Sequence, residues 1–301
     1  LLLNTAVEEK PIIPDIPIAI GKLLNPFSGY SSLINSDKLP DGIIVSSNLI
    51  DTVSVKWDEL RIPHIQAKNE LDLYFMQGYV IAFERLWQME FQTHAAAGRI
   101  SEIVGKKGLE HDRLQRRRGM LYAAKNTLAE IKKDTSLYIL LESFAHGVNF
   151  YINSLHKNKY PIEYKILDYQ PELWTPLKTC LLLKSMSWGL TNRDDKDLAY
   201  TKILNDFGLE VIEELFPIFP SNYDPIIPKN TRFDFAPLIK NTPKTIYKSN
   251  TINSTFKNSN NSFGSNNWVV NGQRTKNKTP ILSNDPHLNL TLPAIWYLMH
   301  L

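Results

Sequence analysis

The sequence has little cysteine, no long apolar run and almost no excess of charge. Cys180 is the one cysteine among 301 residues, so no disulfide can form within the chain, and we expect a small buried hydrophobe there. No stretch reaches 18 consecutive apolar residues, which excludes a membrane-spanning helix within this sequence. The net charge is only +3. The one dense basic run, residues 113–118, is typical of a solvated helix start, so we expect no nucleic-acid partner.

The two ends of the sequence also lack features of a complete chain. It begins with three leucines rather than methionine and stops at Leu301 within an apolar segment. We therefore expect a fragment at both ends. The leading leucines are compatible with the tail of a signal peptide, without deciding the matter. Residues 1–50 are rich in Pro, Ser and Asn and predict an extended lead-in.

Residues 51–240 predict one strand-containing, mostly helical region. Val53, Val55 and Trp57 alternate with polar residues, which indicates a strand over 51–57, and an extended segment follows over 62–67. Asn69 is a typical N-cap for a helix from Leu71 to Phe91, whose apolar residues we assign to core packing. His64 and His94 are also interpreted as structural. Further helices are predicted at residues 99–104, 120–133, 136–155, 179–190, 196–206 and 210–215.

Residues 241–264 contain few apolar residues. The stretch is rich in Asn, Ser, Thr and Lys, so it cannot bury enough surface to offset the entropy of ordering its chain. We interpret it as a spacer, which is the composition expected both of a linker and of a segment removed by cleavage.

The composition changes abruptly at Ser265. The pattern predicts a strand at 268–271, an Asn271-Gly272 turn and a second strand at 280–283, because Asn and Gly both tolerate positive φ. A serine that opens a buried hairpin directly after a spacer suggests a chain start made by cleavage. A terminal serine carries a hydroxyl and an α-amine of pKa near ~7.7–8.0, and the amine can act as the base for that hydroxyl.

Four blocks of this sequence resemble the penicillin acylase family of N-terminal nucleophile hydrolases. Together they span about residues 50–301 in the order found in that family. The blocks are Arg61–Ala67 with Gly78–Val80, Glu84–Glu90 and Ala97–Ile100; Gly147–Asn149 with Tyr151-Ile152; Pro171–Pro176; and Gly264–Trp268 with Pro280–Leu282 and Asn284–Leu288.

The resemblance implies an α+β fold, the αββα sandwich of N-terminal nucleophile hydrolases, of which this chain would hold only a part. Residues 51–240 would form a largely helical α-chain, 241–264 the spacer, and 265–301 the start of the β-chain. The precursor would be a zymogen that self-cleaves between Gly264 and Ser265 into a heterodimer. Ser265 would then hydrolyse the amide bond of a small N-acylated molecule, chemistry linked in this family to antibiotic biosynthesis.

The resemblance also assigns His287, which lies 22 residues after Ser265, a place beside the nucleophile's amine. An alternative from the residues themselves is a triad of Ser265, His287 and Asp285. A Gly-x-Ser-x-Gly turn is absent around Ser265, which argues against an ordinary serine hydrolase. A different alternative is a processed but catalytically silent homologue that serves as a binding or scaffold protein.

Other expectations rest on the resemblance alone. A structural Ca²⁺ would take one acid from this half, for which Asp197 is our choice, and its remaining ligands from beyond Leu301, as would the oxyanion donors. No organic cofactor is expected. An acyl pocket would be lined by three residues of one helix: Met186, Trp188 and Leu190. Relatives are exported, so a periplasmic or secreted location is expected.

Overall fold

A computed structural model describes residues 39, 42–43, 45–191, 194–216, 227, 230–232, 265–288 and 290–301. The chain divides into two compact units. One comprises residues 1–190 with 290–301, and the other comprises residues 191–289. Residues 1–38 of the predicted lead-in (1–50) and the whole predicted spacer (241–264) lie outside the described residues.

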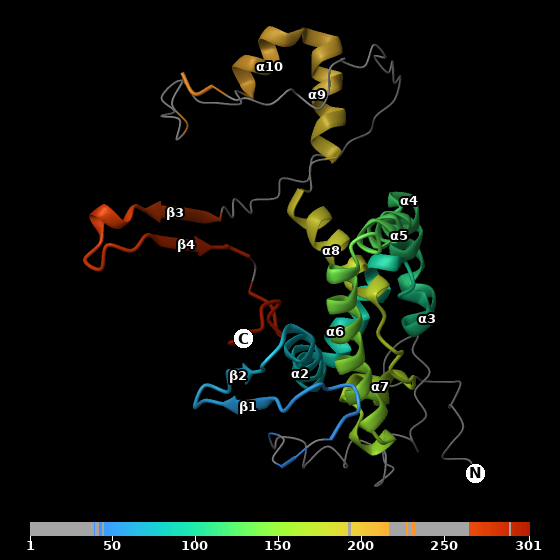
Figure 1. The fold of residues 1–301 in the computed structure, drawn as a ribbon. Coiled ribbons are helices and arrows are strands. Elements are labelled where there is room, and N and C mark those ends of the chain that lie inside the picture. The colour runs from blue at the N-terminus through green and yellow to red at the C-terminus, as the bar shows by residue number, and fades with distance from the viewer. Residues whose placement is uncertain are drawn as a thin grey trace. The chain divides into compact units, whose positions relative to one another are not determined.

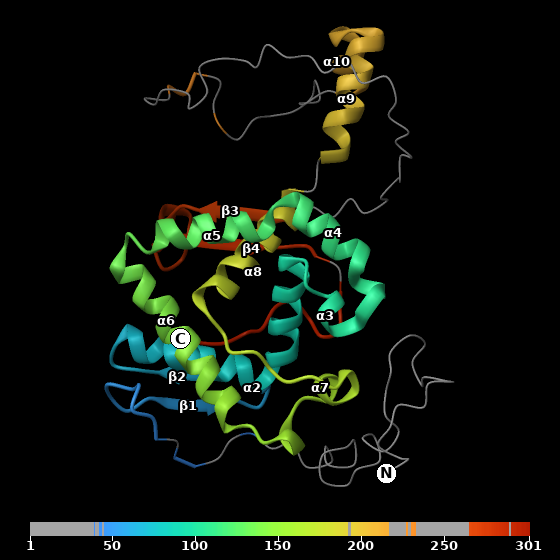
Figure 2. The ribbon, with the colours of Figure 1, turned by 90° about the vertical axis from the view of Figure 1, so that its right-hand side faces the viewer.

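The first unit is built on two helices, α2 (Glu70–Ala97) and α6 (Thr135–Ser154), which lie side by side (Figures 1 and 2). The predicted cap is present, since the Asn69 side chain accepts from the backbone N–H of Asp72. Gly98 ends α2 in the left-handed conformation. Asp134 caps α6 in the same way as Asn69 caps α2.

Glycines allow α2 and α6 to approach closely. A Cβ on Gly147 would lie 1.8 Å from the backbone oxygen of Phe75, and one on Gly78 would lie 2.2 Å from that of Phe144. Buried apolar residues of both helices, including Ala82, Leu86 and Val148, form the main core with Tyr164 and Trp174. Phe75 and Tyr79 of α2 are also buried, as expected of the apolar residues of this helix.

The shorter helices of this unit surround the pair (Figure 2). They are α3 (Ser101–Val104), η3 (Gly105–Gly108), α4 (Leu109–Arg118), α5 (Met120–Ile131), η4 (Lys157–Lys159), α7 (Ile162–Leu167) and α8 (Pro176–Thr191). The basic run at 113–118 ends α4 rather than starting a helix, which corrects our interpretation. Cations are favoured there because the last carbonyls of a helix carry partial negative charge. Cys180 is buried in an apolar cluster, as predicted.

A small sheet lies beside α2 (Figure 1). β1 (Ser54–Trp57) and β2 (Pro63–Gln66) pair antiparallel, with Trp57 opposite Pro63. His300 forms a parallel bridge to His64 on the other side of β2. The buried carboxylate of Asp72 accepts from the backbone N–H groups of Ile50 and Asp51, which ties the segment before β1 to α2.

The second unit contains a helix pair and a hairpin. α9 (Asp194–Phe207) and α10 (Leu209–Leu215) meet at Gly208, whose φ is 85°. β3 (Asn266–Val270) and β4 (Ile281–Asp285) pair antiparallel, with Trp268 opposite Ser283. In the described part of the chain, no helix is long and apolar enough to cross a membrane.

The hairpin corrects two expectations. Asn271 and Gly272 do not form a two-residue turn of positive φ: Asn271 has φ −63° and its side chain caps η5 (Gly272–Arg274). Gly272 is needed for space, because a Cβ there would lie 2.4 Å from the Lys278 carbonyl oxygen. The hairpin is also not buried in this chain, since Val269 and Leu282 are 67% and 75% exposed. A two-stranded ribbon has too few neighbours to bury both of its faces.

Candidate active site

The hairpin brings Ser265 and His287 together, as the sequence spacing suggested. Asn266 pairs with Asp285, so the next positions outward place Ser265 at the start of one strand and His287 just past the end of the other. The Ser265 hydroxyl oxygen accepts from the backbone N–H of His287 at 3.3 Å. The nucleophile candidate is therefore held at the open end of a two-stranded ribbon, with its side chain exposed.

The ring of His287 is oriented by Asp285. Its Nε2 lies 2.7 Å from Asp285 Oδ2. Side chains two apart along a strand face the same side, which brings this pair together across Pro286. Both side chains are exposed, at 37% and 68%. The aspartate–histidine half of a triad is thus present, while the contact between Ser265 Oγ and His287 is made through the backbone.

The three predicted pocket residues lie near the end of α8 but do not share one face. Residues four apart on a helix point the same way, whereas residues two apart point nearly opposite ways. Met186 and Leu190 therefore lie on one side; Met186 is half-buried and Leu190 is 66% exposed. Trp188 lies on the other side, with the Arg118 guanidinium carbon 4.4 Å from its ring centroid.

The contacts of two predicted residues, Gly264 and Asp197, lie outside what the structure describes. Gly264 lies outside the described residues. Asp197 lies in α9, but its side chain is outside the described part of the structure.

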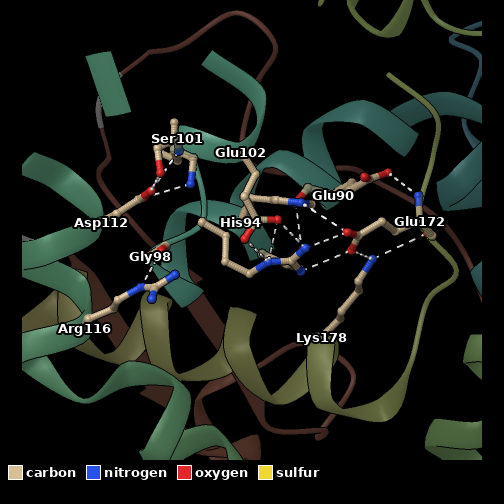
Figure 3. Close-up of polar contacts among 12 residues, drawn as sticks. Glu90, His94, Gly98, Ser101, Glu102, Asp112, Arg116, Glu172 and Lys178 are labelled. Carbon is tan, nitrogen blue, oxygen red and sulfur yellow. Dashed lines mark hydrogen bonds and ion pairs between the residues drawn. The ribbon is translucent and has the colours of Figure 1, made fainter. Parts of the chain in front are cut away.

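A second polar cluster, which our sequence reasoning did not identify, lies in the first unit (Figure 3). Glu90 and His94 come from α2, and Glu172 from the segment before α8. Their ligand atoms all lie within 4.8 Å of one another, close enough for the three side chains to hold a metal ion. Glu90 and His94 are buried, with 1% and 3% exposure.

Basic side chains already neutralise this cluster. Arg99 donates to both oxygens of Glu172, at 2.7 and 3.2 Å, and Lys178 Nζ lies 3.1 Å from Glu172 Oε2. Arg99 also donates to Glu102. The hydrogen bond from Arg99 and the charge of Lys178 lower the pKa of Glu172 to about 2. A cation would have to displace both basic groups.

The partners of Glu90, by contrast, carry no full charge: a hydroxyl group and a backbone N–H donate to it. Tyr164 donates its hydroxyl to Glu90 Oε2 at 2.5 Å, and the Glu172 backbone N–H donates to the same oxygen at 3.2 Å. His94 Nδ1 lies 3.1 Å from the Glu90 carbonyl oxygen, within the same helix. Burial raises the pKa of Glu90, although Tyr164 opposes that effect. Calcium prefers six to eight oxygen ligands, so this cluster, with its histidine and with a Glu172 carboxylate already paired with Arg99 and Lys178, does not fit Ca²⁺.

The sequence held a signal for this cluster. Glu90, Arg99 and Glu172 each belong to one of the blocks quoted above, and Glu90 and His94 are spaced to share a helix face. Asn149 of another block holds the same segment, since its side chain both donates to and accepts from the backbone of Trp174. Residues of the first three blocks thus meet in space around the segment from Pro171 to Pro176.

Known proteins resemble this chain over most of its length. The family model for penicillin amidase matches residues 52–301. The acyl-homoserine lactone acylase QuiP of Pseudomonas aeruginosa is 28% identical over 92% of this chain and 33% of its own length. The penicillin acylase 2 proenzyme of a Pseudomonas species is 28% identical over 83% of this chain and 32% of its own length. The chain thus spans about a third of the length of these relatives.

A solved structure shares the fold. The thermostable penicillin G acylase from Alcaligenes faecalis superposes with a TM-score of 0.50 and 23% identity, covering 61% of this chain and 100% of the matched chain. The expected partial α+β fold of an N-terminal nucleophile hydrolase is therefore confirmed, with a mostly helical body and small sheets. With a family model matched from residue 52 to residue 301, the chain belongs to the penicillin amidase family.

Proposed function

We propose that this chain is part of an amidohydrolase precursor that cleaves itself between Gly264 and Ser265 and then uses Ser265 to hydrolyse the amide bond of a small N-acylated molecule. One observation carries the proposal: Ser265 stands directly before β3, and its hydroxyl accepts from the His287 backbone N–H at 3.3 Å. A relative that is named a proenzyme supports the cleavage step.

Cleavage would begin with attack of the Ser265 hydroxyl on the Gly264 carbonyl carbon. The C–N bond breaks as the acyl group moves to the serine oxygen, and the nitrogen takes up the proton. Water then hydrolyses the resulting ester. This releases the Gly264 carboxylate and leaves Ser265 with a free hydroxyl and a free α-amine.

Amide hydrolysis would also begin with attack of the Ser265 hydroxyl on a carbonyl carbon, here that of the substrate. The α-amine, with a pKa near ~7.7–8.0, accepts the hydroxyl proton as the oxygen attacks the substrate carbonyl, and then returns that proton to the leaving amine. Water resolves the acyl-enzyme. The His287 N–H would hold the hydroxyl in place, while the His287 ring, paired with Asp285, would orient the α-amine.

The substrate class follows from the named relatives, which act on penicillins or acyl-homoserine lactones. We propose a small N-acylated amide whose acyl chain contacts Met186, Leu190 and Trp188. Asp197 is proposed to contribute one ligand to a structural Ca²⁺. Export to the periplasm or beyond the cell is also proposed on the resemblance alone, as is the division into α-chain, spacer and β-chain.

Substitutions at Ser265 test the proposal. Ser265→Ala should abolish both the appearance of a chain that begins Ser-Asn-Asn-Trp, detected by mass spectrometry, and amide hydrolysis. Ser265→Cys should still be cleaved but hydrolyse amides about 10²-fold more slowly, because the longer C–S bond misplaces the attacking atom. Ser154→Ala, an exposed serine at the end of α6, is the matched control. An intact single chain with full activity contradicts the proposal.

A second experiment separates the proposed base from a triad. The two mature chains are produced separately and combined, with the Ser265 amine either free or permanently acylated. Loss of activity in the acylated form is expected if the α-amine is the base. Equal activity of both forms would assign that role to His287 with Asp285 instead.

A further inference from the structure

Two histidines outside the candidate active site lie in direct contact. His64 is in β2 and His300 is 236 positions further along the chain, and their Nδ1 atoms are 3.0 Å apart. The rings are nearly perpendicular, at 86°, with centroids 5.2 Å apart. Backbone hydrogen bonds hold β2 against the segment around His300: Ile65 N–H donates to the His300 carbonyl, and His300 N–H donates to the Pro63 carbonyl, each at 2.9 Å.

Asp58 fixes the orientation of His64. Its Oδ1 accepts from the backbone N–H groups of Leu60 and Ile62, both at 2.9 Å, so the carboxylate is anchored by the turn between β1 and β2. Its Oδ2 lies 3.3 Å from His64 Nε2. A carboxylate at this nitrogen keeps the proton on Nε2, and the lone pair of His64 then lies on Nδ1, facing His300.

We propose that His64 and His300 form a binding site for a divalent copper or nickel ion, coordinated by their two Nδ1 atoms. With metal–nitrogen bonds of about 2.0–2.1 Å, a separation of 3.0 Å corresponds to an angle of about 94° at the ion. That is close to the 90° between neighbouring ligands of square-planar or octahedral ions and smaller than the tetrahedral angle that zinc prefers. Both side chains are exposed, so water can complete the coordination.

The surroundings favour this pair over the Glu90 cluster. Asp58 occupies the position of the carboxylate that commonly orients a metal-binding histidine from behind. Without an ion, the Nδ1–H of His300 donates to His64. When the ion binds, the His300 proton moves to Nε2, so no net proton is released. Lys56 pairs with His64 across the strands and adds one cation on that face, which the Asp58 carboxylate offsets.

The test is a calorimetric titration of the full chain with Ni²⁺ or Cu²⁺ alone, which measures the affinity and the number of ions bound. One ion per chain should bind, and affinity should fall at least tenfold in His64→Gln and in His300→Gln. Asp58→Asn should lower affinity about 10- to 100-fold by freeing the ring of His64. His156→Gln, which alters an exposed histidine elsewhere in the first unit, should bind as the unmodified chain does.

A spectroscopic measurement makes the test independent of variants. The electron paramagnetic resonance spectrum of the Cu²⁺ complex should show coupling to two imidazole nitrogens. The proposal is overturned if the ion binds with unchanged affinity in both His64→Gln and His300→Gln, or if the bound ion shows fewer than two imidazole nitrogens. Because the site is independent of Ser265, Ser265→Ala should retain it whether or not the proposed hydrolase activity is correct.

Discussion

The side chain of Glu90 is almost completely buried, and only one of its oxygens has a hydrogen-bond partner among the described residues. Oε2 accepts from Tyr164 and from the backbone of Glu172. Burial without a direct cationic partner raises the pKa of this carboxyl. The neutral acid is therefore favoured in the folded chain relative to the unfolded chain.

Substitutions of Glu90 should distinguish how much its hydrogen bonds and how much its charge contribute to the unfolding free energy. Glu90→Gln keeps an acceptor for Tyr164 and resembles the neutral acid, so we expect a loss of less than about 1.5 kcal/mol in unfolding free energy. Glu90→Ala leaves the Tyr164 hydroxyl unpaired and opens a cavity, which should cost about 2–4 kcal/mol. Urea denaturation measures both values. An equal loss in the two variants would show that the hydrogen bonds contribute little.

Asp285 is predicted to act through His287. Asp285→Asn removes the charge that holds the His287 ring at 2.7 Å. The pair is exposed, so its energy is at most about 1 kcal/mol, equivalent to about a fivefold fall in kcat/KM. The pH profile of kcat/KM should change with it, because the His287 ring is proposed to orient the α-amine that serves as the base. Glu213→Gln, an exposed acid in α10, serves as the control. An unaltered profile in Asp285→Asn would remove the pair from the mechanism.

Among the elements, α2 and α6 depend on backbone contact at two glycines. The Gly147→Ala side chain would overlap the Phe75 carbonyl oxygen, which lies 1.8 Å from the ideal Cβ position. Because the neighbour is backbone, the helices must move apart, and we expect a loss of about 1–3 kcal/mol.

The control for this prediction is Gly189→Ala in α8, where an added Cβ meets nothing within 4 Å. That change should stabilise the chain by ~0.5–1 kcal/mol, because alanine loses less conformational entropy in a helix. Thermal unfolding of both variants checks the pair. Equal effects would mean that glycine flexibility, rather than helix contact, matters at Gly147.

At the scale of the first unit, Glu172 joins the segment before α8 to the residues that follow α2 through Arg99, and to α8 itself through Lys178. Its pKa is about 2 in the folded chain, against an ordinary value of 4.5. A lowered pKa means that the carboxylate stabilises the fold at pH values above 4.5. That stability is lost as pH falls from 4.5 towards 2, when the unfolded chain binds the proton first.

We therefore expect the unfolding free energy to fall across this acid range, and to fall less steeply in Glu172→Gln. At neutral pH the same variant should be less stable, since Arg99 and Lys178 lose their shared partner. Urea denaturation at several pH values between 2.5 and 7 measures both effects. A slope in Glu172→Gln as steep as in the unmodified chain would assign the acid sensitivity to other carboxyls.

The sequence by itself determined the parts of this protein that depend on short-range rules. The Asn69 cap, the apolar period of α2 and the strands on either side of residues 271–280 follow from residues a few positions apart. The proximity of Ser265 and His287 also follows, because the register of a hairpin places its two open ends together.

Only the tertiary structure decided which distant polar groups meet. Glu172 lies 82 positions from Glu90, and His300 lies 236 positions from His64. No local sequence pattern predicts either contact, because each depends on how helices and strands pack. The path of residues 271–280 was likewise decided by the close approach of Gly272 to Lys278, a backbone contact that turn preferences do not encode. Local propensity specifies elements, whereas burial and packing specify which side chains those elements bring into contact.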